Sequence, residues 1–447
     1  MENGAGAPPG AHRAPLPRAI ASGMNAAPAP SHAPTAPRSR PQRVPPALLR
    51  GSEALQGQVV LEELRDDLGL LLFRSLRNVL IWTQLPVEER ASAFAPGAAA
   101  GRQAEMEAAA LPPELLAPLS VIAELLAAPY AVDERRLALA CRRVALWAED
   151  AGALGAALEF SQAAALVRPT AAALAYAVGR LARRRAEYDR AESWFARAII
   201  QGRQSRDWRA YATAFSGLGN LHLQRGNFPA ARRAHGRCLR AARRHALREL
   251  EGNALHDLFV TSYHAGEHGE AIQFAGQALA AYGPAHRQVP RLAYDLAYNW
   301  VLQGHFREAL PVATALLPRF GTAAERLLVQ GLICRAAGGS GDGAAFDGAC
   351  AEVVAAGMAE ATPDTYSGAL VGAAHGAASL GRWALAEQMA TRISAVAQER
   401  GEGELVIMAD TILDAARRRQ RTDVALQQET AGDTTVAAEF VSALAVR

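Results

Sequence analysis

Several features that would indicate a membrane, a metal or a disulfide framework are missing from this sequence of 447 residues. No apolar run reaches the roughly 18 residues that a membrane span requires, and the nearest candidate, residues 68–82, contains Arg74 and Arg77. The four cysteines are widely spaced without a Cys-x-x-Cys pair, which argues against a zinc knuckle or a secreted disulfide framework. We therefore expect buried free cysteines, a cytoplasmic protein and no cofactor.

Motifs that carry catalysis are also missing. The sequence contains no phosphate-binding G-x-x-x-x-G-K-[ST], no G-x-S-x-G elbow and no H-E-x-x-H helix. The glycine-rich stretch 338–343 lacks the lysine of a phosphate loop, and we interpret it as a flexible insert. His264 and His268 are four residues apart, but Ala265 and Gly266 place them across a turn, and no third metal ligand is suitably spaced. The prediction is a protein that is not an enzyme.

The composition favours helices. Aromatic residues make up only 6% of the chain, whereas 50% is hydrophobic and alanine is prominent. This mixture is typical of many helices that pack closely through small side chains. The formal charge of +3, from 47 basic and 44 acidic residues, gives no general attraction to nucleic acid or to an anionic membrane.

The chain divides into four parts. Residues 1–46 are rich in Pro, Ala and Arg with almost no large apolar side chain, so they cannot offset the entropy of ordering and should form a disordered tail. Residues 47–130 are an N-terminal helical region, with helices expected at 58–84 and 113–128. A repetitive segment follows from 131 to 416, and residues 417–447 are predicted to be a frayed polar tail.

The repetitive segment shows one spacing of residues again and again. In residues 172–199, Gly179 is followed by Tyr188, Ala191, Phe195 and Ala198. The next copy has the same classes of residue at Phe215, Leu218, Gly219, Phe228, Ala231, His235 and Cys238. Small residues at fixed positions let two helices approach closely, and large residues fill the gaps between them. This pattern resembles the tetratricopeptide repeat.

The resemblance implies an all-α, right-handed α-solenoid of about seven helix-turn-helix units, preceded by the helical region. Copies begin near residues 138, 172, 212, 252, 290, 326 and 367, and the copy at 326 is weak. Most units are longer than the 34 residues of the family, and the extra residues fall after the second helix. The repeats therefore resemble the long-unit members of the family.

In this family the first helix of each unit lines a concave groove that binds peptides. Carried over by register, the candidate binding residues here are Tyr176, Arg180, Arg183, Arg184, Asn220, Gln224, Asn253, His256, Tyr263, Arg291, Tyr294 and Tyr298. Arginine can bind carboxylates, asparagine can bind a peptide backbone, and tyrosine offers flat area with a hydroxyl. The resemblance implies an adaptor or scaffold that binds an extended segment of a protein, and the arginines suit an acidic segment. The family's clamp for terminal carboxylates is disfavoured, because Ser216 stands where a basic residue would precede Asn220.

A second hypothesis rests on a basic helix in the third copy. Seven arginines form a basic surface on this helix and its extension: Arg232, Arg233, Arg237, Arg240, Arg243, Arg244 and Arg248. They could bind RNA, DNA or an acidic protein, as in a nucleic-acid-associated or transcription-related regulator. The stripe lacks the aromatic residues on which bases stack, so nucleic acid is the less favoured partner. Alanine-rich helix faces can also self-associate.

Overall fold

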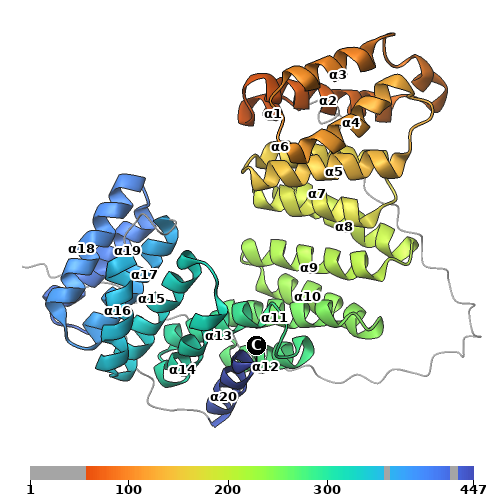
Figure 1. Ribbon diagram of the computed structural model, residues 1–447. Coiled ribbons are helices and arrows are strands. Elements are labelled where there is room, and N and C mark those ends of the chain that lie inside the picture. Colours follow the sequence, from red (N-terminus) through yellow and green to blue (C-terminus); the bar gives the residue numbers. More distant parts are fainter. Residues whose placement is uncertain (1–56, 357–362, 423–430, 447) are drawn as a thin grey trace, which may run out of the picture. The chain divides into compact units, whose positions relative to one another are not determined.

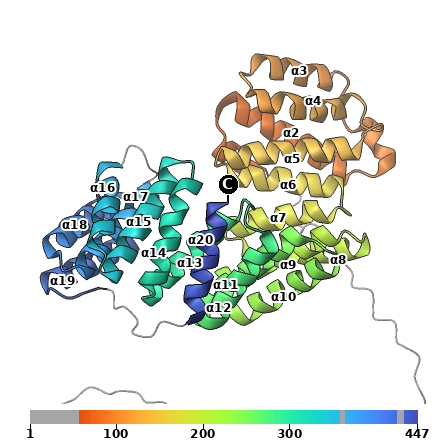
Figure 2. The same ribbon diagram turned by 60° about the horizontal axis from the view of Figure 1, so that its bottom comes forward.

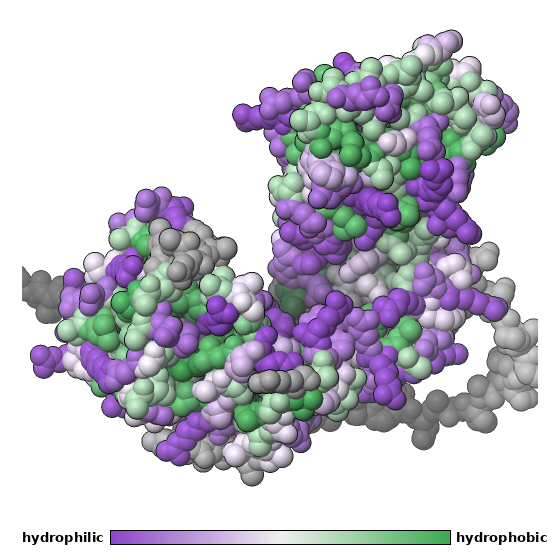
Figure 3. All heavy atoms as spheres, viewed as in Figure 1, coloured by the Kyte–Doolittle hydropathy of each residue, from purple (hydrophilic) through white to green (hydrophobic). Residues whose placement is uncertain are grey.

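The computed structural model describes residues 57–356, 363–422 and 431–446, and within these ranges all regular structure is helical (Figure 1). The tail predicted for residues 1–46 lies outside the described residues. No described helix is long and apolar enough to cross a membrane. In the view of Figure 3, hydrophilic and apolar residues are interspersed over the surface.

The N-terminal region contains more helices than the sequence indicated. It consists of α1 (Gln58–Glu63), α2 (Asp66–Gln84), the 3-10 helix η1 (Val87–Ser92), α3 (Ala98–Ala108) and α4 (Pro113–Ala127). The single helix expected at 58–84 is broken because Leu64 is extended, and a Cβ on Gly69 would lie 1.7 Å from the Leu64 carbonyl oxygen. Helix α3 was not predicted, since only Met106 of its residues is buried.

Glu63 connects this region to the first repeat. Its carboxylate accepts hydrogen bonds from the backbone N–H groups of Gly155 and Ala156, both at 2.9 Å, and forms an ion pair with Arg185 at 3.0 Å. The two N–H groups belong to the first turn of α6, where an acid is favoured by the helix dipole. A side chain 92 residues away therefore caps this helix.

The predicted repeats are seven antiparallel helix pairs, which confirms the α-solenoid. We call the first helix of each pair the A helix and the second the B helix. The pairs are α5 (Glu134–Asp150) with α6 (Leu154–Val167), α7 (Ala172–Arg184) with α8 (Tyr188–Gln204), α9 (Trp208–Gln224) with α10 (Phe228–Arg244), α11 (Arg248–His264) with α12 (His268–Tyr282), α13 (Val289–Gln303) with α14 (Phe306–Leu316), α15 (Ala323–Ser340) with α16 (Gly343–Ala356), and α17 (Pro363–Ser379) with α18 (Trp383–Arg400). Between α14 and α15 lies the 3-10 helix η2 (Leu317–Arg319), and α19 (Gly403–Arg417) follows the last pair. The extra residues of the long units lie at the start of the A helix as well as in the B helix, since α9 begins at Trp208, before the register position 212.

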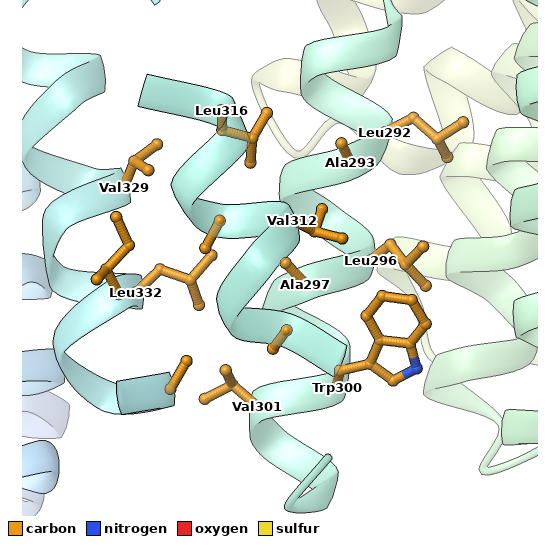
Figure 4. Close-up of a cluster of buried hydrophobic side chains, with 14 of the residues drawn as sticks. Leu292, Ala293, Leu296, Ala297, Trp300, Val301, Val312, Leu316, Val329 and Leu332 are labelled. Atoms are coloured by element: carbon orange, nitrogen blue, oxygen red, sulfur yellow. The ribbon is translucent and has the colours of Figure 1, made fainter. Parts of the chain in front are cut away.

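Small residues in the repeat pattern occupy the close contacts between helices. A Cβ on Gly179 of α7 would lie 2.8 Å from the ring of Phe195, and a Cβ on Gly217 of α9 would lie 2.5 Å from the same ring. Phe195 of α8 is therefore a large residue fitted between two glycines of successive A helices. Further along the chain, aliphatic side chains such as Ala297, Val312 and Leu332 lie between α13, α14 and α15, whereas Trp300 points from α13 to the side away from α14 and α15 (Figure 4).

The four cysteines are free and buried, as expected. Burial raises the pKa of both Cys141 and Cys238 to about 12.

The glycine-rich stretch 338–343 is not a flexible insert. Its first residues end α15, Gly341 adopts the left-handed conformation that ends the helix, and α16 begins at Gly343. Helices α15 and α17 meet along glycines: a Cβ on Gly338 would lie 2.3 Å from the Cα of Gly376, and a Cβ on Gly372 would lie 2.2 Å from the carbonyl oxygen of Gly331. The glycines therefore let the two backbones touch.

Where the structure describes it, the C-terminal segment is likewise not a frayed tail. Residues Ala431–Ala445 form α20, which packs against α14, α12 and α13 (Figure 2). Phe440 is 0% exposed and Leu444 is 3% exposed. Arg319 of η2 donates hydrogen bonds to the carbonyl oxygens of Leu444 at 3.2 Å and Val446 at 2.6 Å. Short and alanine-rich, this segment carries no repeat pattern, so nothing in its sequence revealed where it would pack.

The glycine contact between α15 and α17 gives a test. Replacing Gly338 by alanine would push the backbones apart, and we expect the free energy of unfolding to fall by about 1–3 kcal/mol. A matched control is Gly348→Ala in α16, where no atom lies within 4 Å of the added Cβ; this change should raise stability by roughly 0.5–1 kcal/mol. Urea unfolding followed by circular dichroism measures both. Equal effects of the two substitutions would contradict the close contact.

Candidate functional site

The candidate residues taken from the repeat register lie on the A helices α7, α9, α11 and α13. Most of their polar groups bind a neighbouring helix. All 47 basic residues of the sequence are arginines, so these contacts are made by planar guanidinium groups with several N–H donors.

Two of the three α7 arginines bind one carboxylate. Arg180 donates to Glu149 of α5 at 2.6 Å, and Arg184 forms an ion pair with the same side chain. The hydrogen bond from Arg180 is the largest cause that lowers the pKa of Glu149. A carboxylate from a partner would have to compete with Glu149 for these two arginines.

The third α7 arginine links α7 to α9. Arg183 donates to the side-chain oxygen of Gln224 at 3.1 Å, and the Gln224 amide donates to the Tyr188 hydroxyl at 3.2 Å. Tyr176 is half-buried with its ring centroid 5.8 Å from that of Phe195, and burial raises its pKa.

Asn220 of α9 is half-buried. Near it, a side-chain hydrogen bond connects α9 to α11. The Ser216 hydroxyl donates to Asp257 at 2.6 Å. Nδ1 of the buried His235 lies 3.4 Å from the same Asp257 carboxylate. The ring of His235 occupies the space left by Gly219, whose Cβ would lie 2.3 Å from it. Desolvation lowers the pKa of His235, partly opposed by Asp257.

Asn253 and His256 of α11 also have partners within the protein. Asn253 accepts a hydrogen bond at 2.7 Å from the hydroxyl of Tyr282, which belongs to α12. His256 lies 3.0 Å from Asp295 of α13, and Arg291 donates to the same carboxylate at 3.1 Å. Asp295 therefore holds two of the candidate residues together.

The remaining candidates form an aromatic surface, which we call the tyrosine patch: Tyr263 of α11 with Tyr294 and Tyr298 of α13. The rings of Tyr294 and Tyr298 are stacked with their centroids 6.2 Å apart. Burial is the largest cause that raises the pKa of Tyr263 and of Tyr294, and the neighbouring Tyr298 is the second. The pKa of Tyr294 is raised to about 12. Tyr298 is 43% exposed and nearby Leu302 of the same helix is 42% exposed. The patch thus offers apolar area and phenol groups to a ligand.

A pocket of about 390 Å³ adjoins the tyrosine patch at Tyr294. Its other lining residues come from the loop before α13, from α13, from η2 and from the start of α15: Arg287, Pro290, Arg291, Arg319, Phe320, Gly321, Glu325 and Leu328. We call it the arginine pocket. The repeat register predicted only Arg291 and Tyr294 of this set. The others lie in loops, in η2 or near helix starts, outside the ligand positions of the register, and no sequence pattern indicated that they would come together.

The basic helix α10 is only partly paired. Arg232 binds Glu267 and Glu270 of the next pair, and Arg243 donates to Glu251 at 2.8 Å. The guanidinium group of Arg237 lies 5.6 Å from the ring centroid of Phe215. Arg233, Arg240 and Arg244 of α10 are exposed, and so is Arg248, the first residue of α11. Within the described ranges, no group of three or more His, Cys, Asp or Glu side chains could hold a metal ion.

Comparison with known proteins identifies the repeats directly. Residues 170–244, which span α7 to α10, match the tetratricopeptide repeat family. No curated protein matches the sequence.

Solved structures with a similar backbone include a Rap protein complexed with competence and sporulation factor (9% identity, 81% of this chain, 99% of that chain, TM-score 0.41). Aspartyl phosphate phosphatase F from Bacillus subtilis is 11% identical over 86% of this chain and 98% of its own, with a TM-score of 0.42. The TPR2AB domain of yeast Sti1, in a complex with pHSP90, is 16% identical over 63% of this chain and 98% of its own, with a TM-score of 0.24.

The buried His235 predicts a loss of stability in acid. The pKa of a histidine in the unfolded chain is about 6.5, and the folded value is lower. As the pH falls, His235 is therefore protonated in the unfolded state before it is protonated in the folded state. Between about pH 6.5 and the lower pKa of the folded state, the free energy of unfolding falls by up to about 1.4 kcal/mol per pH unit. His235→Leu should lose less stability than wild type between pH 7 and pH 5.

Urea unfolding at the two pH values measures this difference. His264→Leu, which replaces an exposed histidine, is the control and should keep the wild-type pH dependence. The same acid-induced loss in His235→Leu and in wild type would contradict the assignment.

Proposed function

Since residues 170–244 are tetratricopeptide repeats, we propose that this chain is a non-catalytic scaffold that binds an extended segment of a protein partner along its A helices. The observation that carries the proposal is the tyrosine patch. Tyr298 and Leu302 are large apolar side chains exposed on a helix of the repeat array. Exposed tyrosines of this kind dominate the energetics of many protein interfaces, because they bury much area and still form hydrogen bonds.

The candidate residues do not contribute equally in this proposal. Arg180 and Arg184 already bind Glu149, so they chiefly connect α7 to α5. Asn253 likewise serves the contact with Tyr282. The partner segment would therefore be anchored on α11 and α13 and extend from there towards α9.

The chemistry of the buried side chains supports a non-catalytic role. A cysteine nucleophile acts as the thiolate, and burial raises the pKa of Cys141 and Cys238 to about 12. His235 is buried, and desolvation holds it neutral. Free cysteines also suit a reducing compartment such as the cytoplasm.

Removing two tyrosines tests the site. We expect Tyr263→Ala with Tyr298→Ala to weaken partner binding at least about tenfold, because each substitution removes aromatic contact area. The full chain is used as bait in native extract, and the captured protein is then titrated against purified variants. Tyr130→Ala is the matched control, since Tyr130 is 75% exposed in the loop before α5. Undiminished binding to the double variant would refute the proposal.

A second candidate function rests on the exposed arginines of α10, which suit an anionic partner such as a nucleic acid. Arg240→Glu with Arg244→Glu separates the two functions. Under the scaffold proposal the change leaves partner binding intact, whereas under the second function it abolishes a salt-sensitive gel shift with nucleic acid. Wild-type binding of nucleic acid that disappears in this variant, with no loss in the tyrosine variant, would favour the second function.

A further inference from the structure

We propose that the arginine pocket binds an acidic side chain of the partner segment together with an apolar side chain beside it. This inference rests on the proposed scaffold function and specifies the partner's chemistry. Three arginines reach the pocket from three separate segments: Arg287 from the loop before α13, Arg291 from α13 and Arg319 from η2.

Each arginine is held on one side by a group of the protein. Arg287 donates to Glu249 at 3.3 Å, Arg291 donates to Asp295 at 3.1 Å, and Arg319 donates to the backbone carbonyls at the end of α20. These bonds use at most two of the five N–H donors that a guanidinium group carries. The remaining donors are sufficient for a forked contact with a carboxylate.

The acid that lines the pocket is occupied elsewhere. Glu325 accepts hydrogen bonds from the backbone N–H of Thr322 at 3.1 Å and from its hydroxyl at 2.8 Å, in the capping box of α15. The hydrogen bond from the Thr322 side chain is the largest cause that lowers the pKa of Glu325. The carboxylate of Glu325 therefore caps the N-terminus of α15. The two other carboxylates nearby, Glu249 and Asp295, each contact two basic side chains.

The rest of the lining is apolar. Tyr294, Phe320, Leu328 and Pro290 surround the arginines, and Tyr294 also belongs to the tyrosine patch. Because Tyr294 is shared, a peptide segment that binds the tyrosine patch could also place its next side chains in the arginine pocket. A volume of about 390 Å³ accommodates a pair of side chains rather than a folded element.

Helix α20 positions Arg319. The carbonyl oxygens of Leu444 and Val446 accept hydrogen bonds from its Nη1, and the negative end of the helix dipole favours a cation there. Phe440 and Leu444 anchor the helix against the array. Undocking α20 would release Arg319 and so weaken the binding of an acidic segment.

The test starts from a displayed library of random twelve-residue peptides selected on the full chain. We expect the selected peptides to contain Asp or Glu next to an aromatic or aliphatic residue. One selected peptide and its Glu→Gln (or Asp→Asn) counterpart are then labelled and titrated by fluorescence anisotropy. Arg291→Gln and Arg319→Gln should each weaken the acidic peptide about tenfold and leave the neutral peptide unchanged.

Three further variants complete the test, and the two at exposed arginines, Arg287→Gln and Arg233→Gln, keep it independent of folding defects. Arg287→Gln changes a side chain that is 78% exposed, and it should also reduce the preference for the acidic peptide. Arg233→Gln on α10 is the matched control and should have no effect. Phe440→Ala changes no residue of the pocket, yet it should weaken the acidic peptide because α20 would no longer position Arg319.

The outcomes separate the two proposals. Selected peptides without acidic residues, or equal weakening of both peptides by Arg291→Gln and Arg287→Gln, would overturn the pocket assignment while tyrosine-dependent binding still supports the scaffold. Selection of no peptide that depends on Tyr298 would overturn both. Unchanged affinity in Phe440→Ala would overturn the role of α20.

Discussion

The repeat array depends on close approach between helix backbones. At the contacts described above a helix presents glycine or alanine where a larger side chain would separate the pair, as at Gly179 and Gly217 around Phe195. The closest case is α15 with α17, where glycines on both helices leave no room for a Cβ. Large residues then fill only the remaining gaps, so a small number of aromatic side chains suffices for a long core.

Close packing of the A helices also brings their polar side chains within reach of one another. Glu149, Asp257 and Asp295 each receive partners from an adjacent helix. These contacts use positions that the repeat register predicted for ligand binding. Under the proposed function, the surface that remains for a ligand is therefore concentrated on α11 and α13, where Tyr263, Tyr294 and Tyr298 lie beside the ion pairs of Asp295, and on the adjoining arginine pocket.

The helix pairs that follow the repeat pattern could be predicted from the sequence, whereas the elements outside that pattern could not. Glycine, alanine and aromatic residues at a fixed spacing identified all seven pairs, because the same local packing recurs in each unit. The break at Leu64, helix α3 and helix α20 depend on contacts with distant parts of the chain, which no local pattern records. Periodicity likewise placed Tyr294 and Tyr298 on the correct helix but could not reveal Arg287, Arg319 and Phe320, since a loop and a 3-10 helix carry them. The register also could not show that Arg180 and Arg184 would meet Glu149, a residue of the preceding unit.

Helix α20 has a consequence for the order in which the chain folds. In a repeat array each unit contacts mainly its neighbours, so folding can proceed along the chain as it is synthesised. Residues 431–446, however, pack against residues 306–319, and the hydrogen bond from Arg319 to Val446 spans 127 positions. Helix α14 therefore emerges with an apolar face that stays uncovered while α15 to α19 are being made. Folding of the array, otherwise largely local, becomes non-local at α14, and the nascent chain must keep that face from associating with other molecules until α20 arrives.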